Sequence, residues 1–202
     1  MSEIFHSFFV QKRAENMNIS TSGKAIFDSE KWDETATNEN CFLWNEDGTT
    51  IIGLDEEKLA GVTKIRIPSK CTVIRSDYAM SISDDYRNLI KQMLTIEIPD
   101  TVTEIGKYAF YVWRNLEKVT IPSNITSIGE HAFWNCNNLT NIIIPDSVTS
   151  IDGDAFCDCS SLINITYNGT QEQWNNISKK SNWRYDSVIK TVTCTDGVIQ
   201  VN

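Results

Sequence analysis

Long apolar runs, basic residues and histidines are all scarce in this chain of 202 residues. No apolar run approaches the about 18 residues of a membrane-spanning helix, so we expect no contact with a membrane interior. Lysine and arginine total 18 against 27 aspartate and glutamate residues, a net charge of −9. This deficit argues against direct nucleic-acid binding, because a surface for phosphates needs an excess of Lys and Arg.

The first residues, MSEIFHSFFVQKR, lack the features of a secretory signal peptide. Glu3 stands where such a peptide has a basic residue, the apolar stretch is only Phe8-Phe9-Val10, and no small-residue cleavage site follows. We therefore expect a cytoplasmic protein if Met1 is the natural start, and a secreted or surface protein otherwise.

The six cysteines do not form a metal or redox motif. Cys157-Asp158-Cys159 is a C-x-C sequence, whereas zinc and thioredoxin-like sites use C-x-x-C. A chain of this length also needs no disulfides to form a stable core. We expect reduced and mostly buried thiols.

A repeat with a period of 23 residues dominates the sequence. Three stretches superimpose, beginning at Met93, Leu116 and Leu139. An earlier copy begins at Val62 with eight extra residues before the next, and a truncated copy begins at Leu162. The prolines of the four longer copies are Pro68, Pro99, Pro122 and Pro145.

Apolar residues recur at fixed distances from each proline. Positions −3 and −1 alternate with polar residues, which predicts a short strand, and positions +3 and +6 predict a second extended piece. Gly106 and Gly129 then mark a turn, and an Ala-Phe pair follows, for which we expect a helical turn. No copy can bury its apolar edge alone, so the copies must stack into a solenoid.

The pattern L-x-x-I-x-I-P-x-x-V-x-x-I-G-x-x-A-F-x-x-C-x-x-L resembles the BspA-type leucine-rich repeats of bacterial and some protist surface proteins. This resemblance implies a right-handed leucine-rich-repeat solenoid, β-rich with short helical turns and capped at both ends. It also implies a non-enzymatic binding protein, often secreted and involved in adhesion. Trp113 departs from the pattern, since it replaces the cysteine that Cys136 and Cys159 retain.

Four segments are expected. Residues 1–40 form an acidic, partly helical extension, and residues 41–61 a β-hairpin cap with its turn at Asp47-Gly48. Residues 62–167 hold the repeats, and residues 168–202 form a C-terminal cap in which Trp174, Ile177 and Trp183 pack on the last coil. Both caps are needed because an open end would expose apolar columns and unpaired strand edges.

The sequence contains no recognisable catalytic, cofactor or metal motif. Ser22-Gly23-Lys24-Ala25 lacks most of a phosphate loop. Asp152, Asp154 and Asp158 lack the ordered spacing of a calcium loop, and a solvated turn is the better interpretation. We therefore expect no enzyme activity, no cofactor and no metal site.

The expected partner is another protein. The residues between the inward apolar positions should align as columns on a strand face. Further candidates lie in the inserted segment Ser81–Gln92, which interrupts the repeat before Met93, and along the edge formed by the turns with the Ala-Phe pairs, here called the turn edge. A merely solvated sheet face is the alternative. The candidate residues are Lys64, Arg66, Glu97, Lys118, Thr120, Asn141 and Ile143 on the strand face, Tyr86 and Arg87 in the insert, and Tyr111 and Trp134 on the turn edge.

Negative charge is concentrated in one segment. From Asp28 to Glu57 there are ten acidic residues and one basic residue, Lys31, so the remainder is close to neutral. An alternative function follows, in which the protein is a phage-type or mobile-element-type inhibitor that blocks a basic groove of a host nucleic-acid enzyme. A solubilising cap is the simpler interpretation. The acidic patch comprises Glu46, Asp47, Asp55, Glu56 and Glu57.

Overall fold

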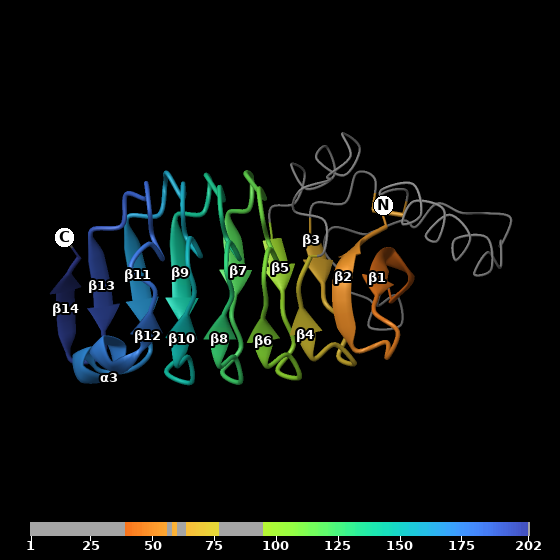
Figure 1. The fold of residues 1–202 in the computed structure, drawn as a ribbon, viewed down its shortest axis with the longest axis horizontal. Coiled ribbons are helices and arrows are strands. Elements are labelled where there is room, and N and C mark those ends of the chain that lie inside the picture. Colours follow the sequence, from red (N-terminus) through yellow and green to blue (C-terminus); the bar gives the residue numbers. More distant parts are fainter. Residues whose placement is uncertain (1–38, 56–57, 60–63, 77–94, 202) are drawn as a thin grey trace, which may run out of the picture. The chain divides into compact units, whose positions relative to one another are not determined.

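Successive coils of the chain stack in register, and each repeat coil contributes one strand to each of two sheets (Figure 1). The computed structural model describes residues 39–55, 58–59, 64–76 and 95–201. Within these residues the coils repeat every 23 residues and the predicted solenoid is confirmed. Nearly all of the expected N-terminal extension lies outside the described residues.

One sheet, here called sheet A, has the order β1-β2-β4-β6-β8-β10-β12. Its strands are β1 (Phe42–Trp44), β2 (Thr50–Leu54), β4 (Val73–Ile74), β6 (Glu104–Ile105), β8 (Ser127–Ile128), β10 (Ser150–Ile151) and β12 (Ser178–Lys179). Only β1 and β2 pair antiparallel in this sheet, and they form the hairpin expected from the sequence. A single 3-10 turn, η2 (Glu39–Cys41), precedes them.

The other sheet, sheet B, has the order β14-β13-β11-β9-β7-β5-β3. Its strands are β3 (Lys64–Arg66), β5 (Thr95–Glu97), β7 (Lys118–Thr120), β9 (Asn141–Ile144), β11 (Asn164–Tyr167), β13 (Thr191–Cys194) and β14 (Gly197–Gln200). The pairs are parallel except for β13 and β14. The helix α3 (Gln171–Asn176) follows β11 and begins with a capping box at Thr170.

The core lies between the sheets and is built from the predicted columns. Residues at −3, −1, +3 and +6 from each proline are at most 8% exposed. The phenylalanines of the Ala-Phe pairs stack from coil to coil, with ring centroids 5.1 Å apart for Phe110 and Phe133 and 5.4 Å apart for Phe133 and Phe156. Trp183 meets Phe156 edge-on at 6.0 Å and continues this column beyond the last Ala-Phe pair.

The prediction of a helical turn around the Ala-Phe pair is wrong. From Tyr108 to Trp113 the backbone N–H groups alternate between two kinds of acceptor. Those of Tyr108, Phe110 and Val112 donate to carbonyls of the next coil, while the other three donate three residues back within their own coil. Every N–H of the segment is therefore paired, half of them to the next coil, and the segment forms a third hydrogen-bonded side of the solenoid.

Left-handed residues make this third side possible. Tyr108, His131 and Asp154 have φ of 54° to 57° at position +9, and Val112, Asn135 and Asp158 have φ of 55° to 63° at position +13. A left-handed residue interrupts the right-handed turn on either side of it, so the segment runs as an extended ribbon instead of closing into a helix. We call its outer surface the turn face.

All six cysteines are free and buried, as predicted. Cys136 and Cys159 occupy the column position that Trp113 occupies in the repeat beginning at Met93. The Sγ–H of Cys136 donates to the carbonyl of Phe110 at 3.2 Å, and that of Cys159 donates to the carbonyl of Phe133 at 3.1 Å. Burial raises the pKa of Cys159 to about 12 and that of Cys136 well above its usual value of 9.0. These thiols therefore stay protonated near neutral pH.

The left-handed backbone at Val112 is a strained position for a β-branched residue. Replacing Val112 by asparagine, the residue at the same position of the next coil, should raise the free energy of unfolding by about 0.5–1 kcal/mol, the relief of strain exceeding the loss of a half-buried apolar contact. The converse substitution, Asn135→Val, should lower it by about 1–2 kcal/mol. Urea unfolding curves measure both changes. A stable Asn135→Val variant would contradict the proposed role of the left-handed residues.

Because burial raises their pKa values, the thiols should resist alkylation in the folded protein. Iodoacetamide at about pH 8 should leave Cys136 and Cys159 unmodified by mass spectrometry, whereas all six should react in denaturant. The contribution of the buried Cys159 thiol to the free energy of unfolding is fully present below pH 9.0, the usual thiol pKa. It is lost as the pH rises toward about 12, the pKa of Cys159 in the folded protein. Rapid modification of Cys159 in the folded protein would show that the coil opens.

Candidate binding surfaces

The outer face of sheet B carries the predicted strand-face residues in two aligned columns. In one column Arg66 pairs with Glu97, Glu97 with Thr120, and Thr120 with Ile143. In the other, Lys64 pairs with Thr95, and Thr95 with Lys118. The structure therefore brings Lys64, Arg66, Glu97, Lys118, Thr120, Asn141 and Ile143 onto one surface.

This strand face is mostly polar, and many of its groups bond to one another. Arg66 Nε lies 2.8 Å from Glu97 Oε2 across adjacent coils. Farther along, Asn164 Oδ1 accepts hydrogen bonds from the hydroxyls of Thr191 at 2.8 Å and Thr193 at 3.1 Å. Ile143 stands between these groups with 46% of its surface exposed. Val198, 52% exposed, stands in the same register column through Thr166 and Thr193, so both Ile143 and Val198 are large apolar side chains exposed on a mostly polar surface.

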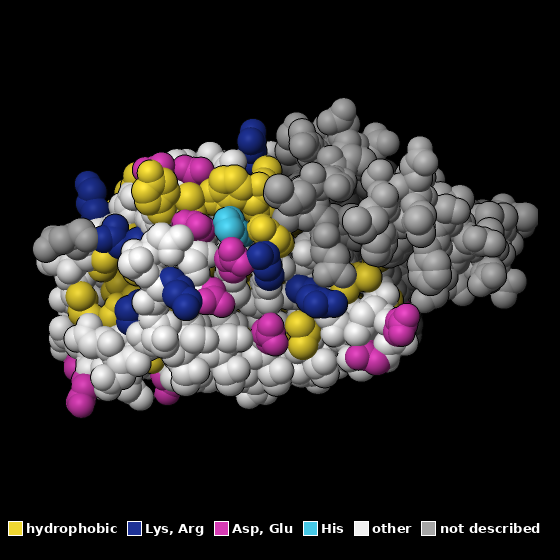
Figure 2. Space-filling model, in the orientation of Figure 1, with side chains coloured by type: hydrophobic (Ala, Val, Ile, Leu, Met, Phe, Trp, Pro, Cys, Tyr) yellow, Lys and Arg dark blue, Asp and Glu magenta, His cyan; other side chains and the backbone are white. Residues whose placement is uncertain are grey.

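The turn face holds a cluster of rings, the aromatic patch, made of Tyr108, Tyr111, His131 and Trp134. Ring centroids lie 4.6 Å apart for Tyr111 and Trp134, 5.1 Å for Tyr108 and His131, and 5.5 Å for His131 and Trp134. Figure 2 shows hydrophobic side chains gathered around the histidine, with carboxylates beside them. The structure thus joins Tyr111 and Trp134, as the sequence predicted for the turn edge, and adds His131.

The charges around the aromatic patch differ from one coil to the next. Lys107 Nζ lies 2.5 Å from Glu130 Oε2, and this hydrogen bond raises the pKa of Lys107 and lowers that of Glu130. One coil further, Asp154 Oδ2 lies 3.6 Å from Nε2 of His131. Asp158 Oδ2 accepts a hydrogen bond of 3.1 Å from Nε1 of Trp134.

Sequence reasoning missed this association of acids with rings. Asp154 and Asp158 were considered there only as calcium ligands. Among the described residues no group of three or more His, Cys, Asp or Glu side chains is arranged to hold a metal ion. Asp, Asn and His at positions +9 and +13 were the available signal, because these residues tolerate the left-handed region.

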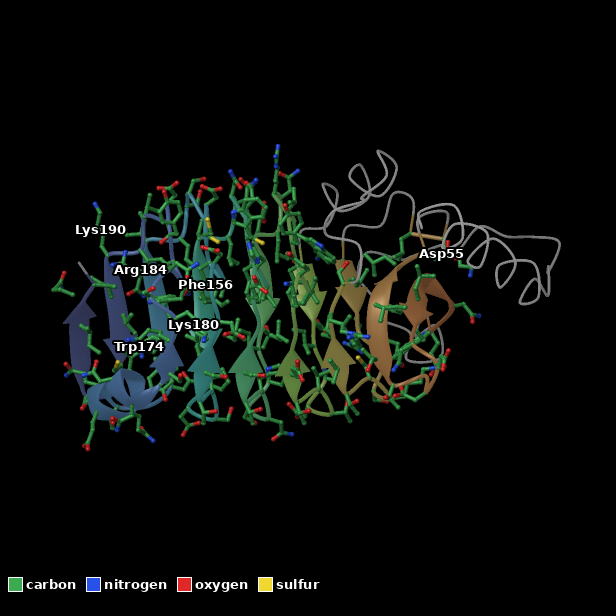
Figure 3. All side chains as sticks on the ribbon, in the orientation of Figure 1. Asp55, Phe156, Trp174, Lys180, Arg184 and Lys190 are labelled. Carbon is green, nitrogen blue, oxygen red and sulfur yellow. The ribbon has the colours of Figure 1, made fainter. Side chains whose placement is uncertain are left out.

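The acidic patch is only partly described. Asp47 caps the hairpin turn, accepting hydrogen bonds from the N–H and hydroxyl of Thr49, which lower its pKa. Asp55 lies 3.0 Å from Lys58, at the hairpin end of the stack (Figure 3). Glu46 is exposed in the same hairpin turn. Outside the described residues lie Glu56 and Glu57 of the patch, and Tyr86 and Arg87 of the insert.

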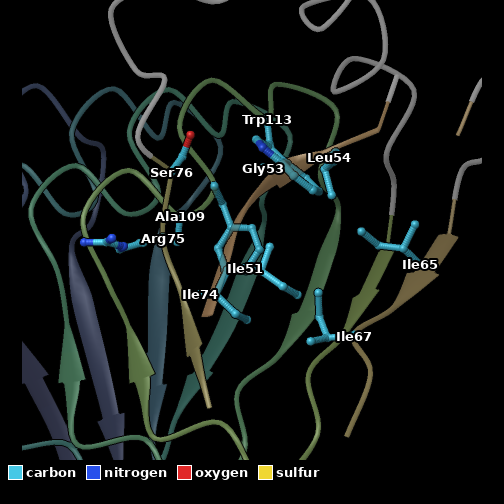
Figure 4. A pocket seen from close by; sticks show the side chains of 11 residues that line it. Ile51, Gly53, Leu54, Ile65, Ile67, Ile74, Arg75, Ser76, Ala109 and Trp113 are labelled. Carbon is cyan, nitrogen blue, oxygen red and sulfur yellow. The ribbon is translucent and has the colours of Figure 1, made fainter. Parts of the chain in front are cut away.

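The cavity in the described part of the core is too small for an organic ligand. It holds about 20 Å³, room for about one water molecule. Its walls are mainly aliphatic, with Ile51 and Ile74 from sheet A, Ile65 from sheet B and Trp113 from the turn segment (Figure 4). In the part of the chain that the structure describes, no helix has the length and apolar character required to cross a membrane.

Several solved structures share this architecture. A leucine rich cell surface protein of Faecalibacterium prausnitzii is 26% identical over 69% of this chain, with a TM-score of 0.50, and the match spans 41% of that protein. A T. pallidum leucine rich repeat protein is 20% identical over 76% of this chain and 68% of its own, with a TM-score of 0.57. The pneumococcal vaccine antigen PcpA is 19% identical over 77% of this chain and 35% of its own, with a TM-score of 0.56. The last two likenesses concern the fold alone.

No curated protein sequence matches the chain. A family model does: the BspA type leucine rich repeat region matches residues 80–202, in six copies. These residues make up more than half of the sequence and include the three regular repeats, whose core columns and coil stacking are described above. The chain therefore belongs to the BspA-type leucine-rich repeat family.

Proposed function

We propose that this protein is a non-enzymatic module that binds another protein through the outer face of sheet B. The observation that carries the proposal is the exposed Ile143, which stands in a register column with Glu97 and Thr120 on a rigid parallel sheet. Repeat proteins use such extended surfaces for recognition, because stacking presents many side chains at fixed spacing. An exposed aliphatic group within a polar surround also matches the apolar centre and polar rim of protein interfaces.

A cell-surface location is the second element of the proposal. The Faecalibacterium relative is described as a cell surface protein, and the pneumococcal one as a vaccine antigen. Both descriptions favour a location outside the cell, where the protein would recognise another protein, over the cytoplasmic location expected from the first residues. The chain spans less than half of either relative, so their own partners are not assigned to it.

The acidic-inhibitor hypothesis receives less support from the described residues. Asp47 and Asp55 already make local contacts with Thr49 and Lys58. Groups held in this way lose part of their interactions if they turn toward a basic partner. The inhibitor role stays a prediction that rests on Glu46, Glu56 and Glu57.

Substituting Ile143 should separate the strand face from other surfaces. We expect Ile143→Asp to abolish capture of a partner from host cell-surface extracts, because a charge would replace the exposed apolar contact. Ile163→Asp is the matched control, since Ile163 is 56% exposed but precedes β11 and lies outside the two columns. Photo-crosslinking from position 143, followed by mass spectrometry, would identify the partner. Both variants should keep their unfolding free energies within about 0.5 kcal/mol of the parent.

Reversing the acidic patch tests the inhibitor hypothesis in the same assay. The triple variant Glu46→Lys, Glu56→Lys, Glu57→Lys should leave capture of the strand-face partner unchanged, because that contact is proposed to run through the sheet B columns around Ile143. If this variant loses the partner while Ile143→Asp retains it, the strand face is the wrong surface. A partner recovered only from cytosol at low salt would then favour the inhibitor.

A further inference from the structure

Among the described residues, three tryptophans have a cation from their own chain over the ring. Lys70 Nζ lies 4.3 Å from the ring centroid of Trp44, Lys179 Nζ lies 4.9 Å from that of Trp174, and Arg184 Cζ lies 6.0 Å from that of Trp183. Trp113 is 3% exposed and inaccessible. Trp134 is half-buried on the turn face, and no described Lys or Arg side chain lies over its ring.

Unneutralised carboxylates lie beside Trp134. Asp158 accepts the indole N–H, and Asp154 is 3.6 Å from His131. Within the described ranges neither these two nor Asp186 has a Lys or Arg within ion-pair distance. All three acids act on Cys157, whose pKa rises to about 11, chiefly through burial and then through their negative charges. The described part of the turn face therefore carries carboxylates next to a half-buried aromatic ring.

We propose that Trp134, Asp154 and Asp158 form a docking site for an arginine side chain in a basic segment of a partner protein. A guanidinium can stack on the indole ring while its N–H groups donate to carboxylates at the ring edge. Arginine fits better than lysine, because its planar group stacks and donates in a fixed fork. Phosphates would be repelled by the same two acids.

The backbone holds this site in place before any partner arrives. The N–H groups of His131, Phe133 and Asn135 donate to carbonyls of the following coil, which fixes the segment that carries Trp134. Asp154 and Asp158 adopt left-handed φ values of 54° and 55° in that following coil. Little conformational entropy is lost on binding when the contact groups are already fixed. The site lies on the turn face and is independent of the strand face.

The test uses the full chain and a fluorescein-labelled hexa-arginine peptide, with hexa-citrulline as the uncharged analogue. Fluorescence anisotropy should detect binding of hexa-arginine and not of hexa-citrulline. Trp134→Ala should weaken binding by about 2–30-fold, the range that the cation–π contact implies. Asp158→Asn should weaken it by about 3–10-fold and reduce its salt dependence, because the amide oxygen can still accept from Trp134 while the charge is lost.

Control variants distinguish the site from general attraction to an acidic protein. Glu104→Gln removes an exposed carboxylate from β6 in sheet A and should leave binding unchanged. Trp134→Phe should retain part of the affinity, since an aromatic face remains, and its thermal unfolding reports any loss of fold. Ile143→Asp should bind hexa-arginine like the parent, so failure of the strand-face proposal would leave this result intact.

Three results would overturn the inference. One is absence of hexa-arginine binding by the folded parent chain. Another is equal weakening by Glu104→Gln and Asp158→Asn, which would mean that net charge alone attracts the peptide. The third is binding of cellohexaose in place of hexa-arginine, lost in Trp134→Ala but kept in Asp158→Asn, which would make the patch a carbohydrate platform.

Discussion

Backbone hydrogen bonding between adjacent coils is the constraint on which the rest of this structure depends. The N–H of Thr103 donates to Thr72, that of Thr126 to Thr103 and that of Thr149 to Thr126, so the same bond recurs every 23 residues. Parallel strands fix the separation of neighbouring coils at about 4.8 Å. No coil has partners for these groups within itself, and stability is therefore a property of neighbours rather than of single repeats.

The close approach of the coils limits which residues can stand at a turn. A Cβ atom on Gly129 would lie 2.5 Å from the carbonyl carbon of Gly106, a separation that backbone atoms cannot relieve by rotating. The third coil has Asp152 at the equivalent position, and its N–H still donates to Ile128. Glycine is thus required at position 129, where two turns touch, whereas the next coil accommodates Asp152 and keeps the same backbone bond.

Much of the architecture could be predicted from the sequence, because burial of apolar columns leaves a periodic signal. The strand positions of Ile96, Val119 and Ile142 follow from alternation beside a proline, and all three are buried in register. The turn could not be predicted in the same way. Ala and Phe next to glycine fit a helical turn equally well, and Tyr108 and Val112 are residues that rarely adopt positive φ. The hydrogen bonds that decide the matter go to the next coil and are invisible to local propensity.

The surface properties follow from the same regular spacing. Residues one repeat apart face each other across neighbouring coils, so Arg66 meets Glu97 and Lys107 meets Glu130. Where the neighbouring coil offers no Lys or Arg in the same column, a carboxylate has no such ion pair. Among the described residues this holds for Asp154, whose neighbour in the preceding coil is His131. The strand face uses its polar groups on one another and exposes Ile143, whereas the turn face exposes a ring and carboxylates. Trp134 and Ile143 belong to consecutive repeats and lie only nine residues apart, so the two surfaces are joined by a short stretch of backbone although they differ in chemistry. A partner that contacted both the strand face and the turn face would bind more tightly than a partner of either face alone. No change of shape in this protein would be needed, because the stacked coils already hold both surfaces in place before binding.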